Sequence, residues 1–346
     1  MLINLKKKVK IKRLIEPDFV RNLLAKRVKK YYPGVKKIDD LQVEILRNFL
    51  GKFRNFTLRY RLVLNFGKYK KKKNILAKAN TLHDNPKRWF IAAKILERNG
   101  FKKIPKVLDY LPRFNLVLYE EVKGLCPQDL LIQKKIKKIF KVIPEVALFL
   151  KKFHSLKIKK ILPIKNKKEE NKEHRHWLFL IKKCAPKFLK RFKKIYYPLI
   201  KFREKNKKIF PKPEDFSLIH GDLHFGNIIL TDKKVKIIDF GDAQFYDPLD
   251  DLARFLAQSK SMLEYYQPPD YYFYERKIEN LFLKNYFRKK IKNEEKIRIT
   301  FFKVRNFLQM AGILSFIIWP KKDKFLAVKK SLNLAEKELN LLQITN

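Results

Sequence analysis

Residues 216–254 read FSLIHGDLHFGNIILTDKKVKIIDFGDAQFYDPLDDLAR, and this stretch decides the fold. Its apolar start, residues 216–219, predicts a short buried strand that leads into the polar loop 220–227. Two further apolar runs flank the polar turn 231–234, and this pattern predicts a β-hairpin.

Three side chains with oxygen atoms lie next to these predicted elements. Asp222 and Asn227 belong to the polar loop, and Asp239 follows the second strand of the hairpin. We therefore expect the three side chains to meet at one end of the hairpin. Two carboxylates and an amide suit a hard cation such as Mg²⁺, which prefers oxygen ligands.

Three motifs follow one another in this stretch: HGDLHFGN at 220–227, IDFGDA at 238–243 and DPLDDLA at 247–253. Together they resemble the aminoglycoside phosphotransferase/choline kinase family, whose members are relatives of the protein kinases. The kinase pattern places a catalytic Asp and a metal-binding Asn five residues apart, followed by a metal-binding Asp in DFG. This chain carries the same residue types at the same spacing.

The resemblance implies a role for each motif residue. Asp222 would accept the proton of an acceptor hydroxyl, and Asn227 and Asp239 would hold Mg²⁺ on ATP. Asp251 would support the loop that carries Asp222. We therefore expect ATP and Mg²⁺ as the cofactors.

The residues before these motifs resemble the small lobe of the family. Strands are predicted at 42–49, 56–66 and 75–79, with a loop at 50–55 and a lysine-rich turn at 67–74. The resemblance places the loop, which contains Gly51, over the phosphates and brings Lys78 within reach of them. It also places the adenine against backbone groups near Glu120 and Val122.

One feature of the kinase pattern is missing. The helix predicted at 88–96 should supply a Glu that pairs with the strand lysine. No acid lies between Asp84 and Glu97. Three partners for Lys78 therefore remain open: Asp84, Glu97 or Asp239.

The rest of the chain is predicted to be mostly helical. A helix at 142–156 would contain His154, which we interpret as a packed or exposed residue and not as a catalytic one. The charge-rich residues 157–173 predict a mobile loop, and 186–210 predict a basic amphipathic helix bent near Pro198. Further helices are predicted at 252–265, 273–287, 295–316 and 323–342.

The chain has a formal net charge of +49. Residues 131–212 hold 28 Lys and Arg against 5 Asp and Glu, whereas residues 213–257 hold 4 against 9. A basic exterior attracts polyanions, so non-specific contact with anionic membranes or nucleic acid is one expected partner interaction. The motif region is acidic, as a metal-binding site requires.

Composition also indicates the cellular setting. The two cysteines are far apart in the sequence, so neither a disulfide framework nor zinc spacing is expected. The basic start of the chain has no apolar core of the signal-peptide type, and 313–319 is too short to cross a membrane. We expect no transmembrane segment and a cytoplasmic location.

We predict an α+β, two-lobed, protein-kinase-like fold. Residues 1–40 would be a basic lead-in, 41–122 the small nucleotide-binding lobe, and 123–346 the large catalytic and acceptor lobe. The predicted activity is transfer of the γ-phosphoryl group of ATP to a hydroxyl of an amino-sugar, amino alcohol or similar small molecule. Two alternatives are a catalytically weak kinase-like binding module and a basic kinase-like protein acting at anionic membranes or nucleic acid.

Overall fold

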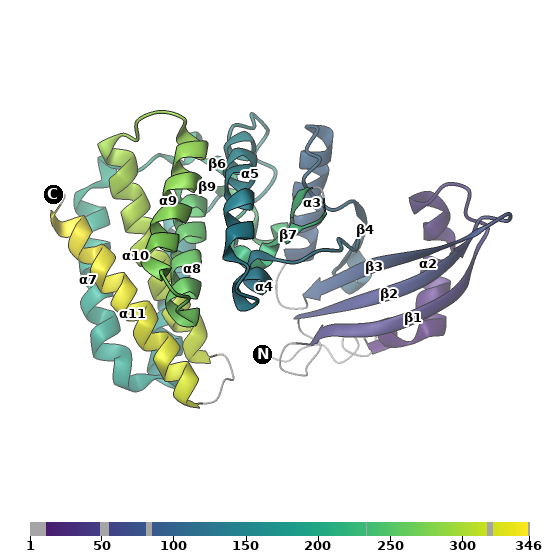
Figure 1. The fold of residues 1–346 in the computed structure, drawn as a ribbon, viewed down its shortest axis with the longest axis horizontal. Coiled ribbons are helices and arrows are strands. Elements are labelled where there is room, and N and C mark those ends of the chain that lie inside the picture. Colours follow the sequence, from purple (N-terminus) through teal and green to yellow (C-terminus); the bar gives the residue numbers. More distant parts are fainter. Residues whose placement is uncertain (1–11, 49–54, 81–84, 233, 317–320, 345–346) are drawn as a thin grey trace. The chain divides into compact units, whose positions relative to one another are not determined.

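The computed structural model describes residues 12–48, 55–80, 85–232, 234–316 and 321–344. The chain divides into two compact units. The first comprises Met1–Lys123 and the short return segment Lys236–Asp242, and the second comprises Gly124–Val235 and Ala243–Asn346. The first unit is rich in strands and the second is mostly helical (Figure 1).

The first unit is built on a five-stranded antiparallel sheet with the order β1-β2-β3-β5-β4. The strands are β1 (Lys37–Asn48), β2 (Asn55–Asn65), β3 (Lys70–Asn80), β4 (Val107–Leu111) and β5 (Leu116–Glu120). β3, which carries Lys78, lies in the middle of the sheet between β2 and β5.

The core of this unit follows from the alternation of side chains along the strands. Leu58, Tyr60 and Leu62 of β2 point to one face and are almost fully buried. Helix α2 (Pro17–Tyr31) covers that core with Val20 and Leu24, two residues of the same buried cluster. Part of the predicted lead-in therefore packs into the hydrophobic core.

The predicted turn at 67–74 is wrong in its length. The chain reverses between Phe66 and Tyr69, where Phe66 N donates to Tyr69 O at 2.9 Å, and β3 already begins at Lys70. Lys70 and Lys71 pair with Asn65 and Leu64 of β2. Pairing with the long strand β2 outweighs the low β-propensity of lysine, whose charged ends remain in water.

Helix α3 (Asn85–Arg98) and the return segment complete the first unit. Trp89 of α3 packs against Tyr119 of β5, with ring centroids 4.2 Å apart. The return segment is fixed by Ile237 N, which donates to Lys103 O at 2.8 Å. Asn85 Nδ2 also donates to Asp242 Oδ1 at 3.0 Å. These bonds position Asp239 within the first unit.

The second unit consists of helices and a few short strands. Its helices are α4 (Pro127–Ile132), α5 (Ile136–His154), α6 (Lys167–Cys184), α7 (Leu189–Lys205), α8 (Leu249–Tyr266), α9 (Tyr271–Phe287), α10 (Asn293–Phe316) and α11 (Lys321–Ile344). Strand β6 (Ser217–Ile219) pairs antiparallel with β9 (Gln244–Tyr246). β7 (Ile228–Leu230) pairs with β8 (Val235–Ile237), whose last two residues begin the return segment of the first unit, and the two strands form the predicted hairpin. α10 packs against α6, α8 and α11.

The predicted loop at 157–173 is also wrong in its length, because α6 begins at Lys167. The side chain of Asn166 caps this helix by accepting Glu169 N at 3.0 Å. Glu169 and Glu170 lie in the first turn, where negative charge interacts favourably with the helix dipole. The high charge density of this stretch suggested a loop. Its two glutamates, however, lie in the first turn of α6, where negative charge stabilises a helix.

A buried ionic network joins α6, α8 and α10. Arg305, which is 1% exposed, donates from Nη1 to Asp250 Oδ1 at 2.8 Å and from Nη2 to Glu173 Oε2 at 3.0 Å. Lys165 Nζ contacts the same Glu173 carboxylate at 2.8 Å. A buried ion is stable only with such partners, so loss of one member leaves an uncompensated charge.

No helix in the described part of the chain is long and apolar enough to cross a membrane.

The network makes stability sensitive to acid. Burial alone raises the pKa of Asp250, but Arg305 and Arg254 outweigh it and hold that pKa at about 2, below the ordinary 3.8. Because the folded-state pKa is depressed, the stabilisation is complete above about pH 4 and is lost as pH falls towards 2. The Asp250 contribution is on the order of 2 kcal/mol.

We expect Asp250→Asn to unfold more easily at neutral pH and to lose less further stability than the parent between pH 4 and 2. Urea denaturation across that range measures both effects. Asp232→Asn, a change at an exposed residue, is the matched control and should follow the parent. Parallel acid dependence in the parent and Asp250→Asn would contradict this role.

Candidate functional site

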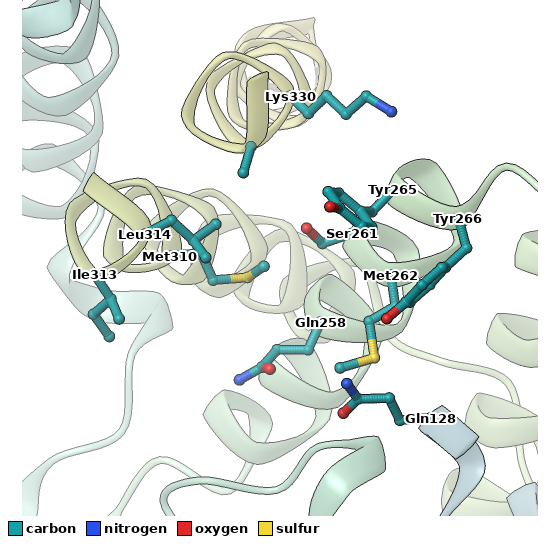
Figure 2. Close-up of a pocket in the computed structure, with 11 residues that line it drawn as sticks. Gln128, Gln258, Ser261, Met262, Tyr265, Tyr266, Met310, Ile313, Leu314 and Lys330 are labelled. Carbon is teal, nitrogen blue, oxygen red and sulfur yellow. The ribbon is translucent and has the colours of Figure 1, made fainter. Parts of the chain in front are cut away.

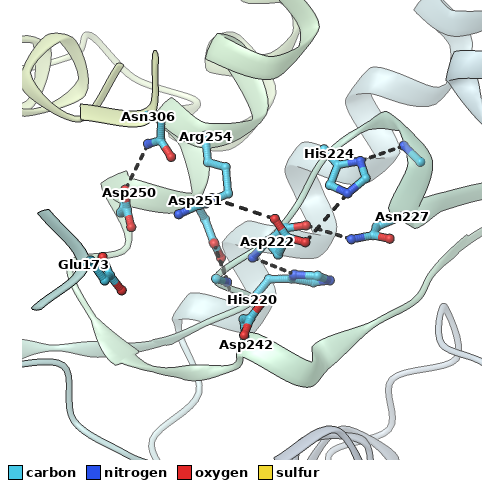
Figure 3. A network of polar contacts seen from close by, with 12 residues as sticks. Glu173, His220, Asp222, His224, Asn227, Asp242, Asp250, Asp251, Arg254 and Asn306 are labelled. Carbon is cyan, nitrogen blue, oxygen red and sulfur yellow. Dashed lines mark hydrogen bonds and ion pairs between the residues drawn. The ribbon is translucent and has the colours of Figure 1, made fainter. Parts of the chain in front are cut away.

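The loop between β6 and β7 carries Asp222 and is held by Asp251 of α8 (Figure 3). Asp251 Oδ2 accepts His220 N at 2.6 Å, and its Oδ1 accepts Gly221 N at 2.8 Å. Gly221 has φ +80°, a left-handed conformation that glycine adopts without strain. The expectation that Asp251 supports this loop is therefore confirmed.

His154 belongs to the same buried group. Its Nε2 lies 3.0 Å from Asp251 Oδ2, and its Nδ1 lies 2.9 Å from the hydroxyl of Tyr286. The interpretation of His154 as a packed residue is confirmed, and its contact gives it a definite task. It fixes the carboxylate that in turn fixes the Asp222 loop.

The carboxylate of Asp222 is partly exposed. Its side chain is 35% exposed, so a small molecule can reach it. Arg254 Nη1 lies 3.8 Å from Asp222 Oδ1, and His224 Nε2 lies 3.7 Å from Asp222 Oδ2. Two cationic or dipolar groups therefore orient this carboxylate without covering it (Figure 3).

Asn227 is brought next to Asp222. Its side-chain Nδ2 donates to the backbone carbonyl of Asp222 at 2.8 Å. This bond fixes the orientation of the amide of a residue that is only 6% exposed. The structure thus holds Asp222 and Asn227 together through the backbone of one loop.

Lys78 and Asp239 form a second group, within the first unit. Lys78 Nζ forms an ion pair with Asp239 Oδ2. Of the alternatives left open by the sequence, Glu97 pairs with Lys94 at 2.6 Å, and Asp84 lies outside the described residues. Asp239 is therefore the partner that the structure gives Lys78.

The backbone at Asp239 has φ +66°, in the left-handed region. A side chain in this region costs energy, although Asp adopts it more readily than most residues. Asp239 lies two residues after the end of β8, and this conformation sets the direction of its carboxylate. Strained positions of this kind occur often at functional sites.

The remaining predicted nucleotide-binding residues are placed as follows. Gly51 lies outside the described residues. Glu120 ends β5, and its backbone N donates to Lys106 O at 2.9 Å. Val122 follows β5 in a segment without regular structure and is partly buried. The backbone N of Glu120 is thus already engaged within the sheet.

The donor types fit a hard divalent cation. Asn227 carries an amide oxygen and Asp239 a carboxylate, and both are the oxygen ligands that Mg²⁺ and Ca²⁺ prefer. Among the described residues, no three His, Cys, Asp or Glu side chains form a cluster that could hold a metal.

Sequence reasoning missed Arg254. It lies at the end of the DPLDDLAR stretch, one helical turn after Asp250 and three residues after Asp251. Residues three apart on a helix lie on neighbouring positions of one face. Since Asp251 contacts the Asp222 loop, a residue three positions later on the same helix can also reach that loop. The spacing of Asp251 and Arg254 was therefore a usable signal in the sequence.

Solved structures resemble the fold of this chain at low sequence identity. An ethanolamine kinase from Plasmodium vivax is 16% identical, with a TM-score of 0.60 over 89% of this chain and 84% of that chain. A spectinomycin phosphotransferase in complex with ADP and spectinomycin is 13% identical, with a TM-score of 0.59 over 94% and 98%. An amicoumacin kinase in complex with AMP-PNP and Ca²⁺ is 15% identical, with a TM-score of 0.61 over 90% and 93%.

These likenesses show an α+β, protein-kinase-like fold. Among curated proteins, comparison by sequence finds no significant match. The sequence matches the Phosphotransferase enzyme family over residues 74–281, which is more than half of the chain. This match includes Lys78, the Asp222 loop and Asp239, and the chain therefore belongs to the phosphotransferase enzyme family.

Proposed function

We propose that this phosphotransferase moves the γ-phosphoryl group of ATP to a hydroxyl of a small molecule, with Mg²⁺. The observation that carries the proposal is the Asp222 loop. Asp251 fixes its backbone through two hydrogen bonds, and the Asp222 carboxylate stays partly exposed beside Arg254. A fixed and accessible carboxylate is what proton acceptance from a bound hydroxyl requires.

The proposed step forms one P–O bond and breaks another. The hydroxyl oxygen of the acceptor attacks the γ-phosphorus and forms a new P–O bond, while the bond to the bridging oxygen breaks. ADP leaves with that electron pair, and the hydroxyl proton passes to Asp222. In such transfers, positioning and charge stabilisation supply most of the rate enhancement.

Lys78, Asp239 and Asn227 would act on the nucleotide. Lys78 provides an ammonium for the phosphate oxygens, and Asn227 and Asp239 would hold the metal. A bound Mg²⁺ would supply positive charge that offsets the charge developing on the phosphates. The amicoumacin kinase with AMP-PNP and Ca²⁺ and the spectinomycin phosphotransferase with ADP support nucleotide and divalent-metal use here.

The proposal also includes the remaining nucleotide contacts, the cellular location and contact with polyanions. Gly51 would lie near the phosphates, and the backbone near Glu120 and Val122 near the adenine. A cytoplasmic location would supply the ATP. Contact with anionic membranes or nucleic acid stays a prediction motivated by the net charge of +49.

The direct test of the proposal is turnover. Purified protein with ATP and Mg²⁺ is mixed with a panel of neutral and amino alcohols, sugars and nucleosides, and ADP release is followed. Phosphorus NMR then identifies a phosphate ester on the acceptor. Absence of any ester across the panel, with intact ATP binding, would favour a kinase-like binding module.

For an acceptor found in this way, Asp222→Asn should lower transfer about 100-fold or more, since general-base and positioning losses usually reach that range. ATP affinity should stay close to that of the parent, because Asp222 acts on the hydroxyl. Steady-state rates and calorimetry measure the two effects, and Asp232→Asn is the matched control. Transfer at the parent rate would exclude Asp222 as the base.

Asp239→Ala should remove the effect of Mg²⁺ on ATP affinity, because the metal would lose its carboxylate ligand. Calorimetric titration of ATP with Mg²⁺ and with EDTA measures this difference in parent and variant. Asp232→Ala, at an exposed position outside the return segment, is the control. Equal Mg²⁺ enhancement of ATP affinity in the parent and Asp239→Ala would rule out the metal role.

A further inference from the structure

A cavity of about 300 Å³ lies within the helical unit and is lined by residues of α4, α8, α10 and α11 (Figure 2). None of the residues discussed so far as catalytic or nucleotide-binding candidates lines it. A volume of this size is at the lower end for small-molecule sites. We call this cavity the acceptor pocket.

We propose that the acceptor pocket binds the body of the phosphoryl acceptor, and that this acceptor is an uncharged alcohol with an apolar body. The assignment rests on the proposed function, because only a phosphotransferase needs an acceptor. It narrows the expected acceptors, since amino-sugars and amino alcohols carry positive charge at neutral pH.

The wall of the acceptor pocket is mainly apolar. α8 contributes Met262, and α10 contributes Met310, Ile313 and Leu314, residues at helical spacing on one face. Figure 2 shows these side chains around the hollow, with the methionines on facing helices. Thioethers and aliphatic groups favour an apolar ligand and adapt to its shape.

The charges of the pocket disfavour a cation. None of the described residues that line it is Asp or Glu. The described lining includes one Lys, Lys330. Its Nζ lies 5.9 Å from the ring centroid of Tyr265 and donates a hydrogen bond to the backbone oxygen of Glu264 at 2.6 Å. A cationic ligand would therefore find no carboxylate partner, and the ring of Tyr265 already faces an ammonium group.

Two polar lining residues, Gln128 and Gln258, lie on the side of the Asp222 loop. A Cβ built at Gly226 would lie 3.5 Å from Oε1 of Gln128, so this amide is next to the loop. Gln258 lies on α8 four residues after Arg254, which contacts Asp222, and such residues share a helix face. Figure 2 shows Gln128 and Gln258 on the same side of the pocket. An alcohol with its apolar body among the methionines can present its hydroxyl on that side.

The experiment compares two alcohols of similar shape. They are 4-isopropylbenzyl alcohol, which is neutral, and 4-(aminomethyl)benzyl alcohol, which is cationic at pH 7. Binding to the full chain is measured by calorimetry and ligand-observed NMR at millimolar concentration. The parent is compared with Leu314→Glu, which adds a carboxylate to the pocket, and with Ser261→Phe, which fills it. Leu341→Glu, at an exposed leucine of α11 outside the pocket, is the matched control.

We expect the parent to bind the neutral alcohol more tightly than the cation. Leu314→Glu and Ser261→Phe should weaken binding of the neutral alcohol by about tenfold or more, and Leu314→Glu should strengthen binding of the cation. Leu341→Glu should match the parent. Preference of the parent for the cation, binding of neither alcohol, or unchanged affinity in both folded pocket variants would overturn the proposal.

Phosphoryl transfer separates this proposal from the proposed function. If the neutral alcohol binds in the pocket but no acceptor receives phosphate from ATP, the pocket assignment as a binding site holds and the proposed function fails. If an acceptor is phosphorylated equally by the parent, Leu314→Glu and Ser261→Phe, the function holds and the pocket assignment fails.

Discussion

The geometry of the candidate site depends on one buried carboxylate. Asp251 has no exposed surface and accepts the backbone N–H groups of His220 and Gly221, while His154 contacts its Oδ2. A buried charge without water needs such donors, and charge-assisted hydrogen bonds are stronger than neutral ones. The first turn of α8 therefore fixes the loop of Asp222, and α5 fixes that turn through His154.

The ion pair between Lys78 and Asp239 replaces an interaction that the kinase pattern assigns to a helix. α3 has no acid between its first residue and Glu97, and Glu97 contacts Lys94. Lys78 is therefore held by a residue of the return segment, whose carboxylate is also the proposed metal ligand. In this arrangement the position of Lys78 depends on the same oxygen atoms that a cation would use. Binding of the metal and release of the lysine towards the phosphates would then be linked.

How much the sequence predicts depends on how local each cause is. The hairpin around 231–234 and the Asp222 loop follow from adjacent residues, and the structure contains both. The strand at Lys70 and the helix start at Lys167 were missed, because pairing with β2 and capping by Asn166 outweigh local charge. The contacts of Arg305 with Asp250 and Glu173 join segments far apart in the chain, so no local pattern reports them.

The scarcity of acids connects the charge of the chain to the acceptor. The chain has 34 Asp and Glu against 83 Lys and Arg. In the helical unit, the buried Asp250 and the partly buried Glu173 each pair with guanidinium or ammonium groups. Asp222 and Asp251 form the loop, and no acid lines the acceptor pocket in the described part of the chain. A pocket for a polycation would need carboxylates that this chain places elsewhere, and the apolar wall is the chemistry that remains for recognition.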